Sequence, residues 1–391
     1  YSFNCGSKVF SSNKFAQFAH NKMSANYWAS SQRNKWQVTR KIIHDARMSI
    51  EAIEKKEFGV NIALQECKYD LNMRIYLHQM IIKLGRRLNL RQLIMSSAEI
   101  YMTRFLLKAS IKEVNIYLLV ATCIYVACKI EECPQHIRTI LSEARRCWPE
   151  FIPNDLTKLA ELEFYLIDEL DCYLIVYHPY NSLTQIVNIL QETHNTSLRV
   201  EITPDELQAA WSIVNDSYIL DLHMMFPPHI IAVAALYLTL LLGVDLNTVE
   251  GNIHQANSVP NSSHSELIKG KSDTARSPSA FNSPNSKMSP VAHMTPRISN
   301  NIKMHTAKRD THAVSELANH KSPPGAQNYR YPKKIEALIN FLASSNINLQ
   351  EVIQSVQELL SLYQSWEFYD EIAERNTVHN ALIVLNKNYS G

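Results

Sequence analysis

The sequence predicts an all-helical protein made of two similar helical bundles. Glycine is rare: the chain has eight glycines in 391 residues, and none lies between residues 86 and 242. That interval therefore lacks Gly-rich phosphate loops and nucleophile elbows, and it favours helices joined by short polar or proline turns. Apolar residues recur at helical spacing along the chain. The apolar segments 121–129 and 233–241 also resemble each other, which indicates a duplicated bundle.

The formal net charge of +2 is unevenly distributed. Residues 244–330 hold ten Lys or Arg against six Asp or Glu, and residues 1–22 hold three Lys and no acid. The rest of the chain is therefore mildly acidic, at about −5, which does not suit non-specific binding to nucleic-acid phosphates, although it leaves room for a local basic patch. The longest apolar runs, 116–128 and 230–242, have about 13 residues and are too short to span a membrane.

The seven cysteines do not form a metal motif, because none belongs to a C-x-x-C pair. Cys123, Cys128 and Cys133 lie five residues apart, which spreads them around a helix instead of directing them at one ion. The odd count and the apolar neighbours favour free thiols in a reducing compartment. We expect no metal and no cofactor.

An N-terminal helix is predicted over residues 23–43, where Ser24 offers an N-cap and tryptophans follow at helical spacing. Residues 44–68 are interpreted as a helix tail and a loop. The first bundle then needs five helices, and Ser110–Glu113 has the pattern of a capping box that starts the central one. The other four are expected at 72–88, 91–109 with Asn89 as cap, 135–147 and 155–170.

The second bundle is interrupted by a segment of different composition. Residues 244–328 are rich in Ser, Asn, Pro and His and hold one aromatic residue, Phe281, so we expect disorder there. Helical periodicity resumes after it, which makes the segment an insertion within the second bundle. The predicted helices are 181–192, from the capping box Thr203–Glu206 to about 220, from Pro227-Pro228 to Gly243, 332–343 and 349–366.

These expectations divide the chain into seven parts. For residues 1–22 a transit peptide is one interpretation, and an upstream extension before a natural start at Met23 is the one we favour. The predicted parts are an extension (1–22), an N-terminal helix and loop (23–68), the first bundle (69–172), the first part of the second bundle (173–243), the insertion (244–330), the last helices of the second bundle (331–370) and a C-terminal tail (371–391).

Two charged residues stand where the pattern predicts apolar ones. Lys129 is the only charge in the run 114–130, and an unpaired buried ammonium would cost several kcal/mol. The matching residue of the second bundle is Leu241, so the fold does not require a lysine. Glu163 lies on the apolar stripe of its own helix, four residues after Leu159. The two opposite charges therefore predict a Lys129–Glu163 pair.

Alternatives to a recognition role stay open for these residues. Lys129 can reach solvent from its helix end, and the pair can be a purely structural salt bridge. Structural ion pairs add little stability, however, and a paired donor and acceptor suits recognition of a partner's backbone. Glu131 and Glu132 either extend the site with charge for a partner's arginines or are ordinary solvated glutamates at a helix end.

Several motifs resemble one family. The run YVACKIEE, from Tyr125 to Glu132, is similar to the central helix of the cyclin box, and Glu163 matches the glutamate on that box's fifth helix. The resemblance is closest to the C-type cyclins, the cyclin subunits of Mediator kinase modules, over 23–243 and 331–370. Its other motifs are SANYW (24–28) with Gln32 and Trp36, KLGRR (83–87), CPQ (133–135) and LIVYHPY (174–180).

This resemblance implies a fold and a function. The fold would be two tandem five-helix cyclin boxes plus an N-terminal helix. Lys129 and Glu163 would hold the αC helix of a cyclin-dependent kinase in its active position, and the helix with Tyr27 and Trp28 would help to select that kinase. The implied partners are the kinase catalytic subunit and other Mediator kinase-module subunits. The implied setting is the nucleus, where the kinase modifies the RNA polymerase II C-terminal repeat domain or transcription factors.

One departure from the wider family concerns peptide docking. Many cell-cycle cyclins bind substrate peptides through a patch on the first helix of the box that ends in tryptophan. Here Met80 stands in the place of that tryptophan, after Met73 and Leu77. We therefore expect these three residues to form core.

The insertion carries candidate phosphorylation sites for a proline-directed kinase. Phosphorylation would add negative charge to a basic segment and could reverse its sign. Ser-Pro pairs are also common in any Ser/Pro-rich sequence, so that simpler explanation has equal weight. The sites, each followed by proline, are Ser277, Ser283, Ser289, Thr295 and Ser322.

Two functions other than a kinase-activating cyclin remain as alternatives. A cyclin-fold general transcription factor that binds DNA would need an N-terminal zinc ribbon and a basic face, and neither is visible. An enzyme would need a nucleophile and a base at suitable spacing. Six of the fifteen histidines fall in the insertion, and the others form no such arrangement. We therefore expect a non-enzymatic regulatory subunit with no direct nucleic-acid or membrane contact.

Overall fold

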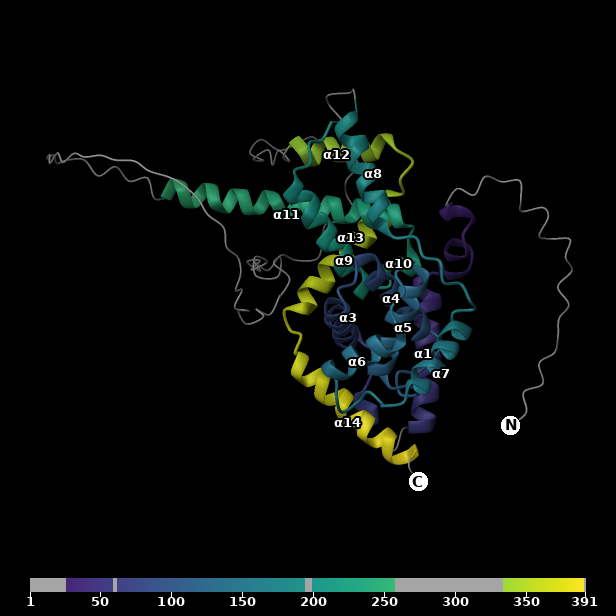
Figure 1. The fold of residues 1–391 in the computed structure, drawn as a ribbon. Helices are drawn as coiled ribbons and strands as arrows, with labels where there is room; N and C mark the ends of the chain where they lie inside the picture. The colour runs from purple at the N-terminus through teal and green to yellow at the C-terminus, as the bar shows by residue number, and fades with distance from the viewer. Residues whose placement is uncertain (1–25, 59–61, 194–198, 257–332, 390–391) are drawn as a thin grey trace, which may run out of the picture.

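The computed structural model describes residues 26–58, 62–193, 199–256 and 333–389. Within these ranges every regular element is a helix, so the all-helical prediction is confirmed. Figure 1 shows two helical bundles, one above the other. The lower, first bundle contains α3 (Leu71–Arg87), α4 (Gln92–Phe105), α5 (Ile116–Ile130), α6 (Ile137–Cys147) and α7 (Leu156–Glu169).

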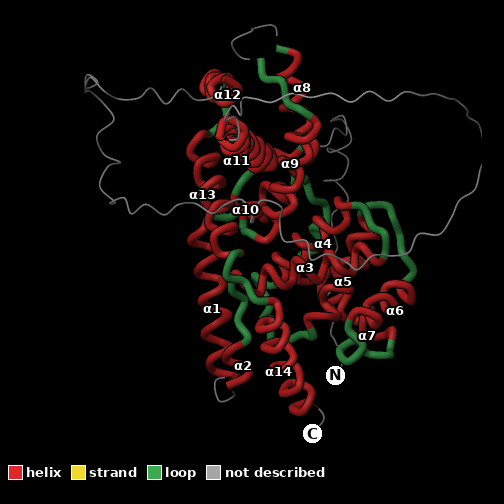
Figure 2. The backbone as a smooth tube through the Cα atoms, turned by 90° about the vertical axis from the view of Figure 1, so that its left-hand side faces the viewer, coloured by secondary structure: helices red, strands yellow, loops and turns green. Residues whose placement is uncertain are grey.

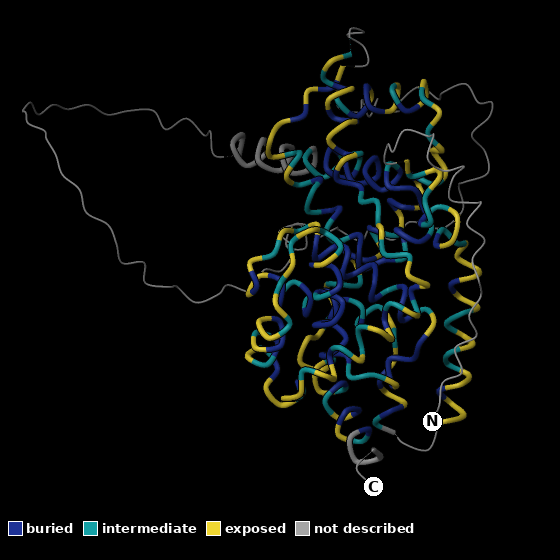
Figure 3. The backbone as a smooth tube through the Cα atoms, turned by 45° about the vertical axis from the view of Figure 1, so that its right-hand side comes forward, coloured by how far each residue is buried: buried dark blue, intermediate teal, exposed yellow. Residues whose placement is uncertain are grey.

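The second bundle is built in the same way around one long apolar helix. Helix α11 packs against each of the other four helices of its bundle, just as α5 does in the first. Figure 3 shows that buried backbone is concentrated inside each bundle. The helices of the second bundle are α8 (Pro179–Glu192), α9 (Pro204–Asp216), α11 (Pro228–Ala256), α12 (Lys333–Ser344) and α13 (Leu349–Trp366). Short elements η3 (Ser217–Ile219) and α10 (Leu222–Met225) join α9 to α11.

Helix α5 owes its central place to its sequence. Asn115 caps it by accepting hydrogen bonds from the N–H groups of Tyr117 and Leu118, and all but three of its residues are buried. This N-cap differs from the prediction, because the pattern Ser110–Glu113 does not start a helix. The Ser110 hydroxyl instead donates to Glu54, so the capping oxygen is used in a tertiary contact.

The prediction of an N-terminal helix over 23–43 is wrong for residues 26–39 and confirmed for residues 40–43. Residues 26–39 form only two short turns, η1 (Tyr27–Ala29) and η2 (Gln32–Trp36), and the long helix is α1 (Arg40–Phe58). The reason is tertiary: this segment bonds to the second bundle instead of continuing as a helix. The Val38 N–H donates to the Met224 carbonyl at 2.8 Å, and Gln32 pairs with the backbone of Tyr177.

Several predicted helix ends also shift. Asn89 does not cap α4; it has a φ of 52° and ends α3, where the Leu90 N–H donates to the Gly85 carbonyl. Gly243 does not end α11, which continues to Ala256. The prediction of a C-terminal tail over 371–391 is wrong for residues 371–389, because Glu371–Tyr389 forms helix α14. Figure 2 shows α14 beside the short helix α2 (Ile62–Glu66), against the first bundle.

Polar contacts fix the two bundles together. Asp221 of the second bundle accepts paired hydrogen bonds from Arg47 on α1 and from Arg74 on α3, at 2.7 to 3.1 Å. The Ser96 hydroxyl on α4 lies 2.8 Å from the Tyr180 hydroxyl on α8. These contacts hold the end of the first bundle in a defined orientation relative to α8 and α10, and the N-terminal segment crosses the same junction.

Candidate functional site

The candidate site lies at the C-terminal end of α5. Lys129 is the second-last residue of this helix, where the backbone turns sharply: the Cys133 N–H donates to the Cys128 carbonyl at 3.0 Å. Glu132 makes this turn with a φ of 52°, a left-handed conformation that is unusual for a residue with a Cβ. The helix end therefore presents Lys129, Glu131 and Glu132 within four residues.

Lys129 and Glu163 form the predicted pair. The Lys129 Nζ lies 2.5 Å from the Glu163 Oε1, which joins α5 to α7, and 4.2 Å from the centre of the Tyr125 ring. Partial burial works against the charged ammonium, but hydrogen bonds to Glu163 and Tyr125 outweigh it and raise the pKa of Lys129. The ammonium is therefore charged and held in one position, with an aromatic face on one side and a carboxylate on the other.

The structure combines the two alternatives for Lys129, a pair with Glu163 and access to solvent. The Lys129 side chain is 42% exposed and the Glu163 side chain 13%, so the lysine reaches solvent from the helix end and is also paired. Phe164, which follows the glutamate, is 74% exposed. Lys129 therefore reaches solvent while Glu163 is largely covered, and α7 also exposes a large apolar side chain.

Glu131 is drawn inward, unlike the solvated glutamate that the helix end suggests. Its Oε1 accepts a hydrogen bond from the Ser97 hydroxyl at 2.6 Å, and that hydroxyl also contacts the His178 Nε2 at 2.8 Å. Burial, with a smaller effect of Arg104, lowers the pKa of His178 to about 3, so this imidazole is neutral. Glu131 thus connects the end of α5 to the start of α8, while Glu132 remains exposed.

Tyr27 and Trp28 lie at the junction of the bundles. The Tyr27 hydroxyl donates to the Gln37 Oε1 at 2.7 Å, and burial raises the pKa of Tyr27 to about 12. Trp28 is 59% exposed, and its ring centre lies 5.9 Å from that of His229 at the start of α11. An exposed indole whose ring packs against another residue, as Trp28 does against His229, is the kind of side chain that anchors protein interfaces.

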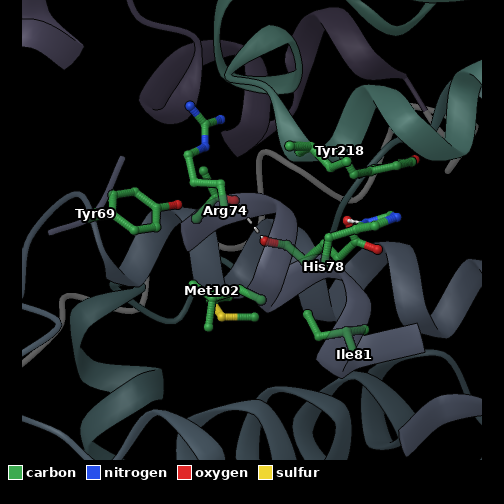
Figure 4. Close-up of a pocket in the computed structure, with 10 residues that line it drawn as sticks. Tyr69, Arg74, His78, Ile81, Met102 and Tyr218 are labelled. Carbon is green, nitrogen blue, oxygen red and sulfur yellow. Dashed lines mark hydrogen bonds and ion pairs between the residues drawn. The ribbon is translucent and has the colours of Figure 1, made fainter. Parts of the chain in front are cut away.

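A second cluster of ionisable groups is buried between the bundles and faces a small cavity. The cavity has about 20 Å³, space for one water molecule. The His78 Nδ1 lies 2.8 Å from the Glu99 Oε2, and the Glu99 Oε1 has no partner among the described residues. Figure 4 shows His78, Arg74 and Tyr218 around this cavity. Burial works against a charged imidazole, yet Glu99 outweighs it and raises the pKa of His78.

Some of the other predicted residues lie within the described ranges and some do not. Met73, Leu77 and Met80 are buried, so their core role is confirmed. Among the described residues no three His, Cys, Asp or Glu side chains could hold a metal ion, and no helix is long and apolar enough to cross a membrane. The extension 1–22 and the sites Ser277, Ser283, Ser289, Thr295 and Ser322 lie outside the described residues.

Two sets of polar contacts between distant residues could not be predicted from sequence patterns. The link from Glu131 through Ser97 to His178 joins residues far apart in the chain, and none of them breaks a local pattern. The clamp of Arg47 and Arg74 on Asp221 was missed for the same reason. Arg74 lies on an amphipathic helix where a solvated arginine would fit equally well, so only the tertiary fold reveals these pairs.

Comparison with known proteins shows which class of protein this chain belongs to. The model of the cyclin N-terminal domain matches residues 47–175, which include the first bundle. This match covers less than half of the chain, but it agrees with the full-length relatives, and together they identify the chain as a cyclin; cyclins are non-catalytic regulatory subunits of kinases. More specifically, the chain belongs to the family of RNA polymerase II holoenzyme cyclin-like subunits, as its full-length relatives show.

Those relatives cover nearly the whole chain. The holoenzyme cyclin-like subunit of Scheffersomyces stipitis is 44% identical over 356 residues, which cover 89% of this chain and 95% of that protein. The subunit of Saccharomyces cerevisiae is 37% identical over 89% of this chain and 94% of that protein. Among solved structures, a chain of the Chaetomium thermophilum CAK complex bound to ATP-gamma-S aligns with a TM-score of 0.46 and 18% identity, over 63% of this chain and 74% of that chain.

Proposed function

We propose that this chain is the cyclin subunit that binds and activates the cyclin-dependent kinase of the Mediator kinase module. The kinase would then phosphorylate the C-terminal repeat domain of RNA polymerase II and thereby regulate transcription in the nucleus. Membership of the RNA polymerase II holoenzyme cyclin-like family supports this assignment. The observation that carries it is the solvent-facing Lys129–Glu163 pair at the end of α5.

The geometry of the pair suits a kinase helix end. Lys129 can donate to backbone carbonyls that a helix leaves unpaired at its C-terminus, and Glu163 can accept from backbone N–H groups. Because each already holds the other in place, little side-chain entropy remains to be lost on binding. The exposed ring of Phe164, which follows Glu163 in α7, offers further apolar area to a partner.

Two further groups are proposed to shape specificity. Trp28 and Tyr27 would contact a part of the kinase that differs between kinases, because the indole projects from the junction of the bundles. Glu132, which is exposed, would pair with arginines of the kinase activation segment. Glu131 would act mainly through its position, since one carboxylate oxygen is already bonded to Ser97.

Reconstitution tests the proposal. The purified kinase catalytic subunit is assayed on a polymerase tail-repeat peptide with and without this chain. We expect the two proteins to co-elute and the chain to stimulate phosphorylation strongly. A chain that is folded, as judged by circular dichroism, but neither co-elutes nor stimulates the kinase would contradict the proposal. A cyclin from another class serves as the control for selectivity.

A further inference from the structure

The positive charge of the first bundle is concentrated on two packed helices. Helices α3 and α6 together carry seven Lys or Arg against a single acid, Glu143. This contrasts with the mildly acidic balance of the chain outside its two basic segments. Arg87 and Arg146 bond to Glu143, and Lys83 precedes Arg87 by one helical turn; we call these three cations the basic cluster. None of them belongs to the Lys129–Glu163 site. Figure 1 shows α3 and α6 together in the lower bundle.

Two arginines of the basic cluster already hold an oxyanion. The Arg87 Nε and Nη2 donate to the Glu143 Oε2 at 3.0 and 2.8 Å, and the Arg146 Nη1 donates to the Oε1 at 2.5 Å. Glu143 therefore bridges α3 and α6 and fixes both guanidinium groups. Lys83 lies one helical turn before Arg87 on the same face of α3. Burial raises the pKa of the Cys147 thiol, and Arg87 and Lys83 lie close enough to oppose that rise in part.

The bridge through Glu143 leaves positive charge and N–H donors of the basic cluster unpaired with it. The basic cluster holds three cations, and its neighbouring carboxylate Glu143 supplies one negative charge, so an excess charge of about +2 remains. A guanidinium has five N–H donors, and Glu143 uses only two from Arg87 and one from Arg146. The remaining donors are accessible, because Arg146 is 65% exposed and Lys83 is exposed. A second oxyanion can therefore bind beside Glu143 without displacing it.

We infer that the basic cluster is a docking site for a phosphorylated Ser/Thr peptide, the product of the kinase that this cyclin activates. This inference rests on the proposed function for the source of the phosphate. A phosphate dianion matches the excess charge of +2 and the fork geometry of the arginines. A long polyanion such as DNA fits less well, because the acidic remainder of the folded chain repels it. Binding a product would keep a repetitive substrate close to the kinase between successive phosphorylations.

Fluorescence polarisation with the full chain tests the inference. The probe is a labelled peptide with one phosphoserine followed by proline, compared with its unphosphorylated form, a glutamate-substituted form and a labelled DNA duplex. We expect the phosphopeptide to bind at least about tenfold more tightly than the others. Arg87→Ala/Arg146→Ala should weaken its binding by about tenfold or more, and Arg87→Lys/Arg146→Lys, which keeps the charge, should also weaken it.

Controls separate this inference from instability and from the proposed function. Lys56→Ala removes an exposed cation on α1 and should leave phosphopeptide binding unchanged. The Lys/Lys variant retains partners for Glu143, so its melting temperature should stay close to wild type. Co-elution with the kinase should persist in both arginine variants. Equal binding of phosphorylated and unphosphorylated peptides, tighter binding of DNA, or loss of the kinase from the folded variants would overturn the inference. Failure of the wild-type chain to bind the kinase would contradict the proposed function alone.

Discussion

The side-chain amide of Gln32 pairs with both backbone polar groups of Tyr177. Its Nε2 donates to the Tyr177 carbonyl at 3.3 Å, and the Tyr177 N–H donates to its Oε1 at 2.6 Å. Gln32 belongs to the N-terminal segment and Tyr177 to the connection between the bundles. This contact therefore anchors the segment that carries Trp28. It also holds that segment in short turns, although its sequence pattern favours a longer helix.

Gln32→Ala should lower the free energy of unfolding by about 1–3 kcal/mol, because the buried Gln32 amide is lost and the part-buried backbone groups of Tyr177 lose their partners. Urea denaturation measures the change. Asn34→Ala is the matched control, since Asn34 is exposed on the same short helix, and its effect should stay within about 0.5 kcal/mol. An unchanged stability for Gln32→Ala would show that the anchor contributes nothing.

Asp221→Asn should lower the free energy of unfolding by about 3 kcal/mol, because it leaves the two arginines without their carboxylate. Burial opposes the charged carboxylate, but Arg74 and Arg47 outweigh it and keep the pKa of Asp221 below its ordinary value. The stability that Asp221 contributes is thus present above its unfolded pKa and is lost as pH falls through the lower folded pKa. Acid titration of unfolding should show a smaller loss in the variant than in the wild type below about pH 4.

The contribution of Asp216 to stability should depend on pH in the opposite direction to that of Asp221. Burial raises its pKa from 3.8 to about 6, while His78 and the hydroxyl of Tyr363, 3.0 Å from its Oδ2, favour the charged form. The stability linked to its protonation is present below its unfolded pKa and is lost as pH rises through about 6. A shift of this size corresponds to up to about 3 kcal/mol.

Asp216→Asn should therefore reduce the change in the free energy of unfolding between pH 4 and 7. It should also raise that free energy at pH 7. Tyr363→Phe removes a hydrogen bond to the carboxylate and should move the transition to higher pH. Urea denaturation at a series of pH values measures both. A wild-type profile with no fall between pH 5 and 7, or one that Asp216→Asn leaves unchanged, would refute this assignment.

Glu132→Gly separates a backbone role from a side-chain role at the end of α5. Glycine adopts a φ of 52° without strain, so stability should rise by up to about 1 kcal/mol. If the carboxylate meets kinase arginines, affinity for the kinase should fall in the same variant. Calorimetric melting and a kinase-binding isotherm measure the two effects, and an unchanged affinity would assign Glu132 to the turn alone.

The sequence was most informative where local pattern and tertiary structure agree. The apolar run of α5 and the capping box at Thr203 locate helices closely, because each depends on residues that are neighbours in the chain. The Lys129–Glu163 pair was predictable for a related reason. Each residue breaks a strong local pattern, and two such breaks of opposite charge within one bundle suggest each other.

The features that were missed depend on contacts between distant segments. Ser110 has the sequence of a helix cap, but a buried glutamate of α1 takes its hydroxyl. Residues 26–39 have helical periodicity, yet bonds to the second bundle hold them in short turns. The helix over 371–389 was missed because its packing onto the first core comes from the fold and not from a strong periodic stripe in its own sequence. In each case a tertiary contact outweighs the local preference.

The central claim is that Lys129 and Glu163 form a kinase-binding site and not a structural salt bridge. A pair with so exposed a lysine should contribute less than about 1 kcal/mol to stability. The most direct measurement is the affinity of the purified kinase for Lys129→Ala and Glu163→Ala, with the melting temperature of each variant. Lys158→Ala/Glu161→Ala, which removes another ion pair on α7, is the matched control. We expect each variant to lose tenfold or more in kinase affinity and to keep a melting temperature close to wild type. The control variant should bind the kinase as the wild type does. Unchanged kinase affinity together with a much lower melting temperature would contradict it.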